Sequence, residues 1–164
     1  MLQIVLTFYI LDDLLGGFYP NDCGPRNVLY KLTETENNTY FQYNVLGETY
    51  YVEHTGIIPK LWDFSYMHIS DKMKSEFNIY KYFDYIRDDD IIDNIFDQKI
   101  SGMNQLCTQI VKMPEYDHVK HLPIFNKIKY ISEFDEDDYP KYIELFNNFE
   151  PTEEHKLLKP IFNY

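Results

Sequence analysis

The sequence predicts a mainly α-helical domain that carries a small β-hairpin element. Apolar side chains recur at helical spacing over residues 2–15, and a Gly-Gly pair then ends the run. A longer apolar stripe covers residues 92–113, broad enough for a buried helix. Between these helices, two stretches rich in Tyr, Thr and Val flank Leu46-Gly47, which is typical of a hairpin. The length is that of one domain, residues 1–164.

Shorter elements complete the prediction. Runs rich in β-branched and aromatic residues predict strands at residues 28–32, 39–45, 48–52 and 57–62. Gly47 is expected to supply the positive φ of the hairpin turn. The polar residues 33–38 are expected to form a loop. Apolar spacing predicts a further helix over 117–131, interrupted at Pro123, and another over 140–149. Thr152, followed by acidic residues in the first turn and then by an apolar run, is expected to cap a last short helix.

Charge and cysteine content restrict the partners and the compartment. The formal net charge of −12 would repel nucleic-acid phosphates and anionic membranes, so we expect neither as a partner. Cys23 and Cys107 are far apart in the sequence, which favours free thiols in a reducing compartment, the cytoplasm. The apolar run 1–15 lacks a basic leader and contains Asp12 and Asp13, so it is expected to be neither a signal peptide nor a membrane span.

Two stretches carry the side chains best suited to chemistry. Asp22 and Asn27 share a loop that leads into a predicted strand, and Asp63 stands just beyond another. Carboxylate and amide oxygens are hard ligands that suit Mg²⁺ and the phosphates of a nucleotide. The sequence therefore predicts that these three side chains meet at one cation site. The alternative is that they are ordinary turn residues.

The first stretch resembles the catalytic loop of the protein-kinase superfamily, which has the form His-Arg-Asp, four residues, Asn. Asp22 and Asn27 have the matching spacing. Pro20 and Asn21 stand where the His and Arg would be, and Gly24 occupies the position that carries a Lys in Ser/Thr kinases. These departures put catalytic competence in doubt.

The second stretch resembles the metal-binding Asp-Phe-Gly of the same superfamily, with Ser65 in place of the glycine after Asp63-Phe64. The hairpin inserted before it resembles kinases encoded by large DNA viruses, and the composition, low in Ala and rich in Asn, Ile, Tyr and Asp, is consistent with that origin. The tail 152–162 resembles the closing helix of protein kinases. The resemblance covers nearly all of this chain but only the C-terminal lobe of a kinase.

The resemblance implies a protein kinase-like phosphotransferase of the Ser/Thr type, or its remnant, in the host cytoplasm or the virion if viral. Asp22 would orient the substrate hydroxyl and accept its proton, while Asn27 and Asp63 would hold Mg²⁺ beside ATP. Asp97, followed five positions later by Gly102, would accept hydrogen bonds from the catalytic-loop backbone. The partners implied are a protein substrate and a separate chain that supplies the N-terminal lobe.

The nucleotide-clasping parts of a kinase are missing from the sequence. No Gly-x-Gly-x-x-Gly loop and no Val-Ala-Ile-Lys lysine precede the catalytic loop. We therefore expect this chain alone to bind Mg²⁺ and ATP weakly or not at all and to transfer no phosphate. Two alternatives stay open: a non-catalytic, pseudokinase-type interaction module, and a fragment of a small-molecule kinase of the choline or aminoglycoside type, which Asn21-Asp22-Cys23 would also suit.

Overall fold

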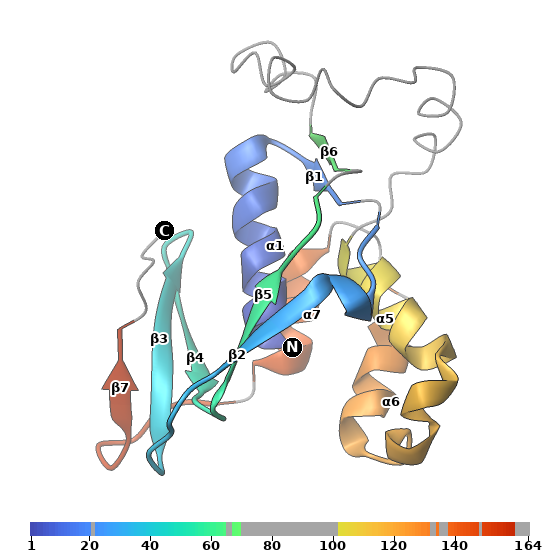
Figure 1. The fold of residues 1–164 in the computed structure, drawn as a ribbon. Coiled ribbons are helices and arrows are strands. Elements are labelled where there is room, and N and C mark those ends of the chain that lie inside the picture. Colours follow the sequence, from blue (N-terminus) through green and yellow to red (C-terminus); the bar gives the residue numbers. More distant parts are fainter. Residues whose placement is uncertain are drawn as a thin grey trace, which may run out of the picture.

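A computed structural model describes residues 1–20, 22–64, 67–69, 102–131, 134, 138–147 and 149–159. The helices and strands run in the following chain order (Figure 1): α1 (Leu2–Leu15), β1 (Phe18–Tyr19), the 3-10 helix η1 (Pro25–Asn27), β2 (Val28–Leu32), β3 (Thr39–Val45), β4 (Glu48–Glu53), β5 (Ile57–Leu61), β6 (His68–Ile69), α5 (Gly102–Lys112), the 3-10 helix η3 (Pro114–Val119), α6 (Pro123–Tyr130), α7 (Tyr139–Phe146) and β7 (Lys156–Leu158).

The fold is mixed α and β, so the prediction of a mainly α-helical domain is wrong. The described residues form seven strands: β1 pairs with β6, β2 pairs with β5, and β4, β3 and β7 make a three-stranded sheet. Strands β1, β6 and β7 have only two or three residues each. Segments this short show no alternating pattern in the sequence, and they become strands because a neighbouring strand satisfies their backbone amides.

Helix α1 is the central element of the core. Its predicted bounds are confirmed, and its buried residues are Leu2, Ile4, Val5, Leu6 and Phe8. Gly16 adopts a left-handed conformation with φ of 60°, and the amides after the helix return to carbonyls of its last turn. Helix α1 contacts α5, α7, β1 and β5. In Figure 1 the three-stranded sheet and the α5–α6 pair lie on opposite sides of α1.

The predicted hairpin is confirmed as strands β3 and β4, which pair in antiparallel register. Leu46 and Gly47 form its turn, with φ angles of 51° and 85°. Two positive φ angles match the right-handed twist of the strands, so a glycine at the second position is well suited. Gln3 of α1 donates a hydrogen bond to the hydroxyl of Tyr43 at 2.8 Å and links the hairpin to the core.

The C-terminal segment corrects another prediction. Between Thr152 and residue 159, where the described part of the tail ends, the backbone forms a turn and then β7, which runs parallel to β3, instead of a helix. His155 Nδ1 accepts a hydrogen bond from the Thr152 N–H at 2.9 Å, which closes the turn. Lys156 forms an ion pair with Glu36, on the loop that precedes β3. The expected cap fails because a neighbouring strand, rather than a further helical turn, takes up the backbone groups of this tail.

The remaining helices agree in part with the sequence. Helix α5 confirms the end of the run predicted over 92–113, whose first ten residues lie outside the described residues. Pro123 begins α6 instead of interrupting a longer helix, because proline fits the first turn, where its missing N–H is not needed. Helix α7 ends three residues earlier than predicted. None of the described helices combines the length and apolar character needed to cross a bilayer.

Candidate functional site

Strand pairing brings two of the predicted site residues to the same place. Asn27 directly precedes β2, and Asp63 follows β5 by two positions. Because β2 and β5 are antiparallel, the start of one strand lies beside the end of the other. The Trp62 N–H donates a hydrogen bond to the Asn27 carbonyl at 2.8 Å, which extends the ladder beyond the strands.

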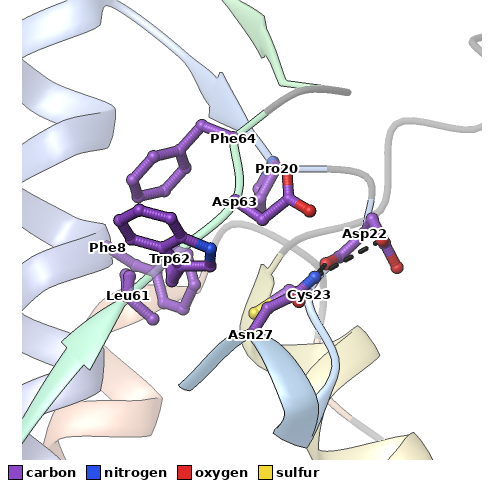
Figure 2. Close-up of a pocket in the computed structure, with 9 residues that line it drawn as sticks. All are labelled: Phe8, Pro20, Asp22, Cys23, Asn27, Leu61, Trp62, Asp63 and Phe64. Carbon is purple, nitrogen blue, oxygen red and sulfur yellow. Dashed lines mark hydrogen bonds between the residues drawn. The ribbon is translucent and has the colours of Figure 1, made fainter. Parts of the chain in front are cut away.

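Asp22, Asn27 and Asp63 line one small cavity (Figure 2). The rest of its wall is mainly apolar and comes from Phe8, Pro20, Cys23, Leu61, Trp62 and Phe64. Its volume is about 10 Å³, which corresponds to the space of one water molecule. Figure 2 shows the carboxylate of Asp63 directed toward the loop that carries Asp22. The structure therefore places the three side chains around a common point, although the chain between them includes a hairpin.

Asp22 already has a counterion. Arg26 Nη2 donates to both carboxylate oxygens, Oδ1 at 2.6 Å and Oδ2 at 2.9 Å. The Arg26 side chain is 68% exposed and that of Asp22 is 23% exposed. The sequence analysis did not single out Arg26, although oppositely charged residues four positions apart are a recognisable pairing signal. This ion pair neutralises the Asp22 carboxylate.

Asn27 closes its loop through hydrogen bonds to Asp22. Its Nδ2 donates to the Asp22 carbonyl at 2.7 Å and, over a longer 3.4 Å, to the Asp22 carboxylate. A carbonyl oxygen only accepts hydrogen bonds, so the first contact fixes the orientation of the Asn27 amide. Its Oδ1 is the end of the amide that these two bonds leave unused. Asn27 is buried, and the two hydrogen bonds of its Nδ2 fix the orientation of the amide.

Asp63 is held in an unusual backbone conformation. Its φ is 59°, in the left-handed region that residues other than glycine rarely adopt. Aspartate tolerates this region better than most residues because its short polar side chain can form local hydrogen bonds. Strained conformations of this kind concentrate at functional sites, where the surrounding structure maintains them.

Helix α5 supports the loop that carries Asp22 and Asn27. Gln105 Oε1 accepts a hydrogen bond from the Cys23 N–H at 2.6 Å. Gly24 lies against Gln109, where an added Cβ would approach the amide oxygen to 2.3 Å. The sequence analysis assigned the supporting role to Asp97, which lies outside the described residues. It missed Gln105 and Gln109 because their only signal is a shared face of the helix at i, i+4 spacing.

Gly102 allows the start of α5 to pack closely. A Cβ at this position would lie 2.5 Å from the Phe8 ring and 2.7 Å from Pro20. Both contacts are shorter than van der Waals distance, and Phe8 is buried. Gly102 thus brings α5 against Pro20, which precedes the loop that carries Asp22.

The two cysteines pack behind the loop as buried, free thiols. Burial raises the pKa of Cys23 to about 12, with the neighbouring Asp22 charge as a second cause. Burial likewise raises the pKa of Cys107 to about 12, with Cys23 as a further cause. Because the thiolate is the nucleophile and the metal ligand, both cysteines are unsuited to either role at neutral pH.

The donor atoms of the site fit a hard divalent cation, but its present volume does not. Two carboxylates and an amide provide the oxygen ligands that Mg²⁺ prefers. Mg²⁺ also retains several waters, and about 10 Å³ holds only one. Within the described residues there is no group of three or more His, Cys, Asp or Glu side chains arranged for a metal ion. A hydrated ion therefore needs the Asp22–Arg26 pair to open.

Comparisons with known proteins leave the site to be interpreted from its own geometry. The arrangement of Asp22, Asn27 and Asp63 is the feature of this chain with the clearest chemical meaning. No protein-family model, no curated protein and no solved structure matches this chain.

Proposed function

We propose that this chain carries the catalytic-loop half of a protein kinase-like phosphotransferase site and depends on a second polypeptide for activity. The observation that carries the proposal is the convergence of Asp22, Asn27 and Asp63 on one cavity. The antiparallel pairing of β2 and β5 brings the two loops together, and the residues that meet there are two carboxylates and an amide. The spacing of these residues and the Asp-Phe sequence at 63–64 add the resemblance to the kinase superfamily.

Each of the three side chains has a role in the proposal. Asp22 orients a substrate hydroxyl and accepts its proton, and Asn27 and Asp63 hold Mg²⁺ through oxygen atoms. The ion, when bound, supplies charge neutralisation for the phosphate oxygens. Phosphoryl transfer depends mainly on positioning and electrostatics, so a strained Asp63 and a buried Asn27 that need little reordering suit it.

Two features of the chain support a second polypeptide as part of the proposal. The chain contains no Gly-x-Gly-x-x-Gly sequence that could cover phosphates. The β2–β5 pair, which leads to the cavity, instead exposes apolar side chains: Tyr30 is 67% exposed, Leu32 69% and Trp62 63%. The exposure of these large apolar side chains makes the β2–β5 pair the candidate surface for that partner. A partner that binds there would lie directly beside Asp63.

Manganese-induced line broadening tests the proposal on the chain as it exists. Mn²⁺, a paramagnetic substitute for Mg²⁺, should broaden the amide resonances around Asp22 and Asp63 before those of other acidic regions. Asp63→Asn should weaken Mn²⁺ binding about tenfold, because it removes one charged ligand and leaves the backbone preference intact. Asp117→Asn is the matched control, since Asp117 is an exposed carboxylate paired with Lys120. Broadening spread evenly over the acidic surface, or unchanged by Asp63→Asn, would overturn the proposal.

The second candidate is a non-catalytic interaction module. It is favoured by the ion pair in which Arg26 Nη2 contacts both carboxylate oxygens of Asp22, and by the single-water size of the cavity, which together describe a site closed to metal. In this case the β2–β5 surface still binds a partner, but no cation enters. Absence of specific Mn²⁺ broadening both in the natural chain and after Arg26→Gln supports this candidate over the first.

A further inference from the structure

The two-stranded ribbon of β2 and β5 has an open edge along β2. Among the described strands, β2 and β5 pair only with each other. The Trp62 N–H donates to the Asn27 carbonyl at one end of the ribbon, and the Thr33 N–H accepts no part in that pair but donates to the carbonyl of Gly56 at the other end. Hydrogen-bonded positions alternate along an antiparallel pair. Two exposed residues of β2 therefore direct their N–H and C=O groups away from β5: Tyr30 and Leu32.

The outer edge of β5 is less suited to a further strand. Pro59 lies opposite Tyr30, at a position whose backbone nitrogen points away from β2. Because proline has no N–H, this edge lacks its central donor, and proline commonly protects sheet edges in this way. The five residues of β2 include no proline, and its open edge ends at Val28, whose N–H bonds to the Pro25 carbonyl. A further strand would therefore pair with β2 beside Tyr30 and Leu32.

The two faces of the ribbon differ in chemistry. Residues directly opposite one another in the register lie on the same face. One face has only aliphatic and aromatic residues: Val28, Tyr30, Leu32, Ile57, Pro59 and Leu61. The other face has two apolar and two basic residues: Leu29, Lys31, Ile58 and Lys60. Both lysines are exposed, and within the described ranges neither forms an ion pair. The ribbon thus contains no acidic residue, although the chain has a net charge of −12.

We propose that the open edge of β2 binds an extended segment of a partner protein in which apolar and acidic residues alternate. The segment adds to the ribbon as a third strand. Its backbone pairs with Tyr30 and Leu32, and its apolar side chains extend the apolar face of the ribbon. An acidic side chain on the other face lies beside Lys31. The inference rests on the proposed function for the need of a second polypeptide, and it names the chemistry by which that polypeptide is recognised.

Charge favours this partner over a second copy of the chain. Two copies would bring together ribbons that each contain two lysines, on chains that each carry a net charge of −12. An acidic segment instead pairs with Lys31. Glu34 and Asp63 follow β2 and β5 by two positions, so these acidic residues lie beyond opposite ends of the ribbon. The favourable position for a carboxylate of the partner is therefore between them, beside Lys31.

Amide hydrogen exchange, measured by NMR on the full chain, tests the proposal with a synthetic peptide. The probe is acetyl-Thr-Val-Glu-Val-Glu-Val-Thr-amide, and the control peptide has lysine in place of both glutamates. The probe should slow the exchange of the Tyr30 and Leu32 amides about tenfold at saturation, because both become hydrogen-bonded. The amides of Leu29 and Lys31, which already face β5, should change little. The control peptide should bind about fivefold more weakly.

Two variants separate the backbone edge from the charge. Tyr30→Pro removes an outward N–H without removing a hydrogen bond between β2 and β5, so it should weaken binding of the probe about tenfold. Lys31→Glu leaves the backbone unchanged and should reverse the preference, so that the lysine peptide binds about fivefold more tightly than the probe. Lys112→Glu, at an exposed position in the last turn of α5, makes the same change in net charge and should preserve the preference for the probe.

The outcomes separate this inference from the proposed function. Protection of no amide by the probe, protection at β5 instead of β2, or equal binding of both peptides overturns the inference. Protection of Tyr30 and Leu32 that rises with chain concentration in the absence of peptide shows that a second copy occupies the edge, which also overturns it. The peptide needs no cation, so Asp63→Asn should leave its binding unchanged. Absence of an Asp63-dependent Mn²⁺ site therefore refutes the proposed function and leaves this inference standing.

Discussion

Replacing Asp63 by glycine and by alanine separates backbone strain from the chemistry of its carboxylate. Both substitutions remove the same carboxylate, but only glycine adopts the observed φ of 59° without a steric penalty. The left-handed region costs an alanine about 1–2 kcal/mol, and the extra freedom of glycine in the unfolded chain offsets about 0.5 kcal/mol of that difference. We therefore expect Asp63→Gly to be more stable than Asp63→Ala by about 1 kcal/mol.

Urea denaturation measures this difference, with Trp62, the only tryptophan of the chain, as a fluorescent reporter beside the substituted residue. The matched control is the same pair of substitutions at Lys60, an exposed position within β5. There the order should reverse, because glycine weakens an extended strand by roughly 0.5–1 kcal/mol relative to alanine. Equal stability of the two Asp63 variants, or a more stable alanine, would show that Asp63 is not held at positive φ. Both variants should lose Mn²⁺ binding alike.

Three further predictions concern the support of the loop. Gln105→Leu leaves the Cys23 N–H without its acceptor and should lower the free energy of unfolding by about 1–2 kcal/mol, whereas Thr108→Val on the same helix should change it by less than about 0.5 kcal/mol in urea titrations. Gly102→Ala should lower the melting temperature, because overpacking of about 1–3 kcal/mol outweighs a gain in helix propensity of about 1 kcal/mol; a higher melting temperature would refute the close contact. Burial raises the pKa of Cys23 and Cys107 from 9.0 to about 12, so the folded state keeps both protons that the unfolded state loses above pH 9. The contribution of the two buried thiols to the free energy of unfolding is thus fully present below pH 9 and decreases toward pH 12, by up to about 1.4 kcal/mol per thiol and pH unit. Cys107→Ala should reduce this slope in denaturation curves measured from pH 8 to 11.

The elements with a strong periodic pattern could be predicted from the sequence. Helix α1 and strands β2, β3 and β4 lie where their patterns place them, to within a residue or two. The turn at Leu46-Gly47 was predictable because glycine accepts the positive φ of a two-residue hairpin turn. In these segments local preference and tertiary packing favour the same conformation.

The elements that depend on a distant partner could not be predicted. Strand β7 consists of three residues with no alternating pattern, and it exists because β3 offers an open edge. The tail that begins at Thr152 was expected to form a capped helix, but the pairing of its backbone with β3, more than a hundred positions earlier in the sequence, takes precedence. The mainly helical prediction failed for this reason, since local signals count the strong helices and overlook short, partner-dependent strands.

The side chains suited to chemistry can be identified from the sequence alone: they are two carboxylates and an amide on two loops, one of which has the spacing of a kinase catalytic loop. Their arrangement depends on the fold, because the antiparallel register of β2 and β5 sets Asn27 beside the residues that follow β5. The fold also pairs Arg26 with the Asp22 carboxylate and limits the cavity to the space of about one water. Distances between loops depend on tertiary packing, which no local sequence pattern encodes, whereas the identities of the three side chains can be read directly from the sequence.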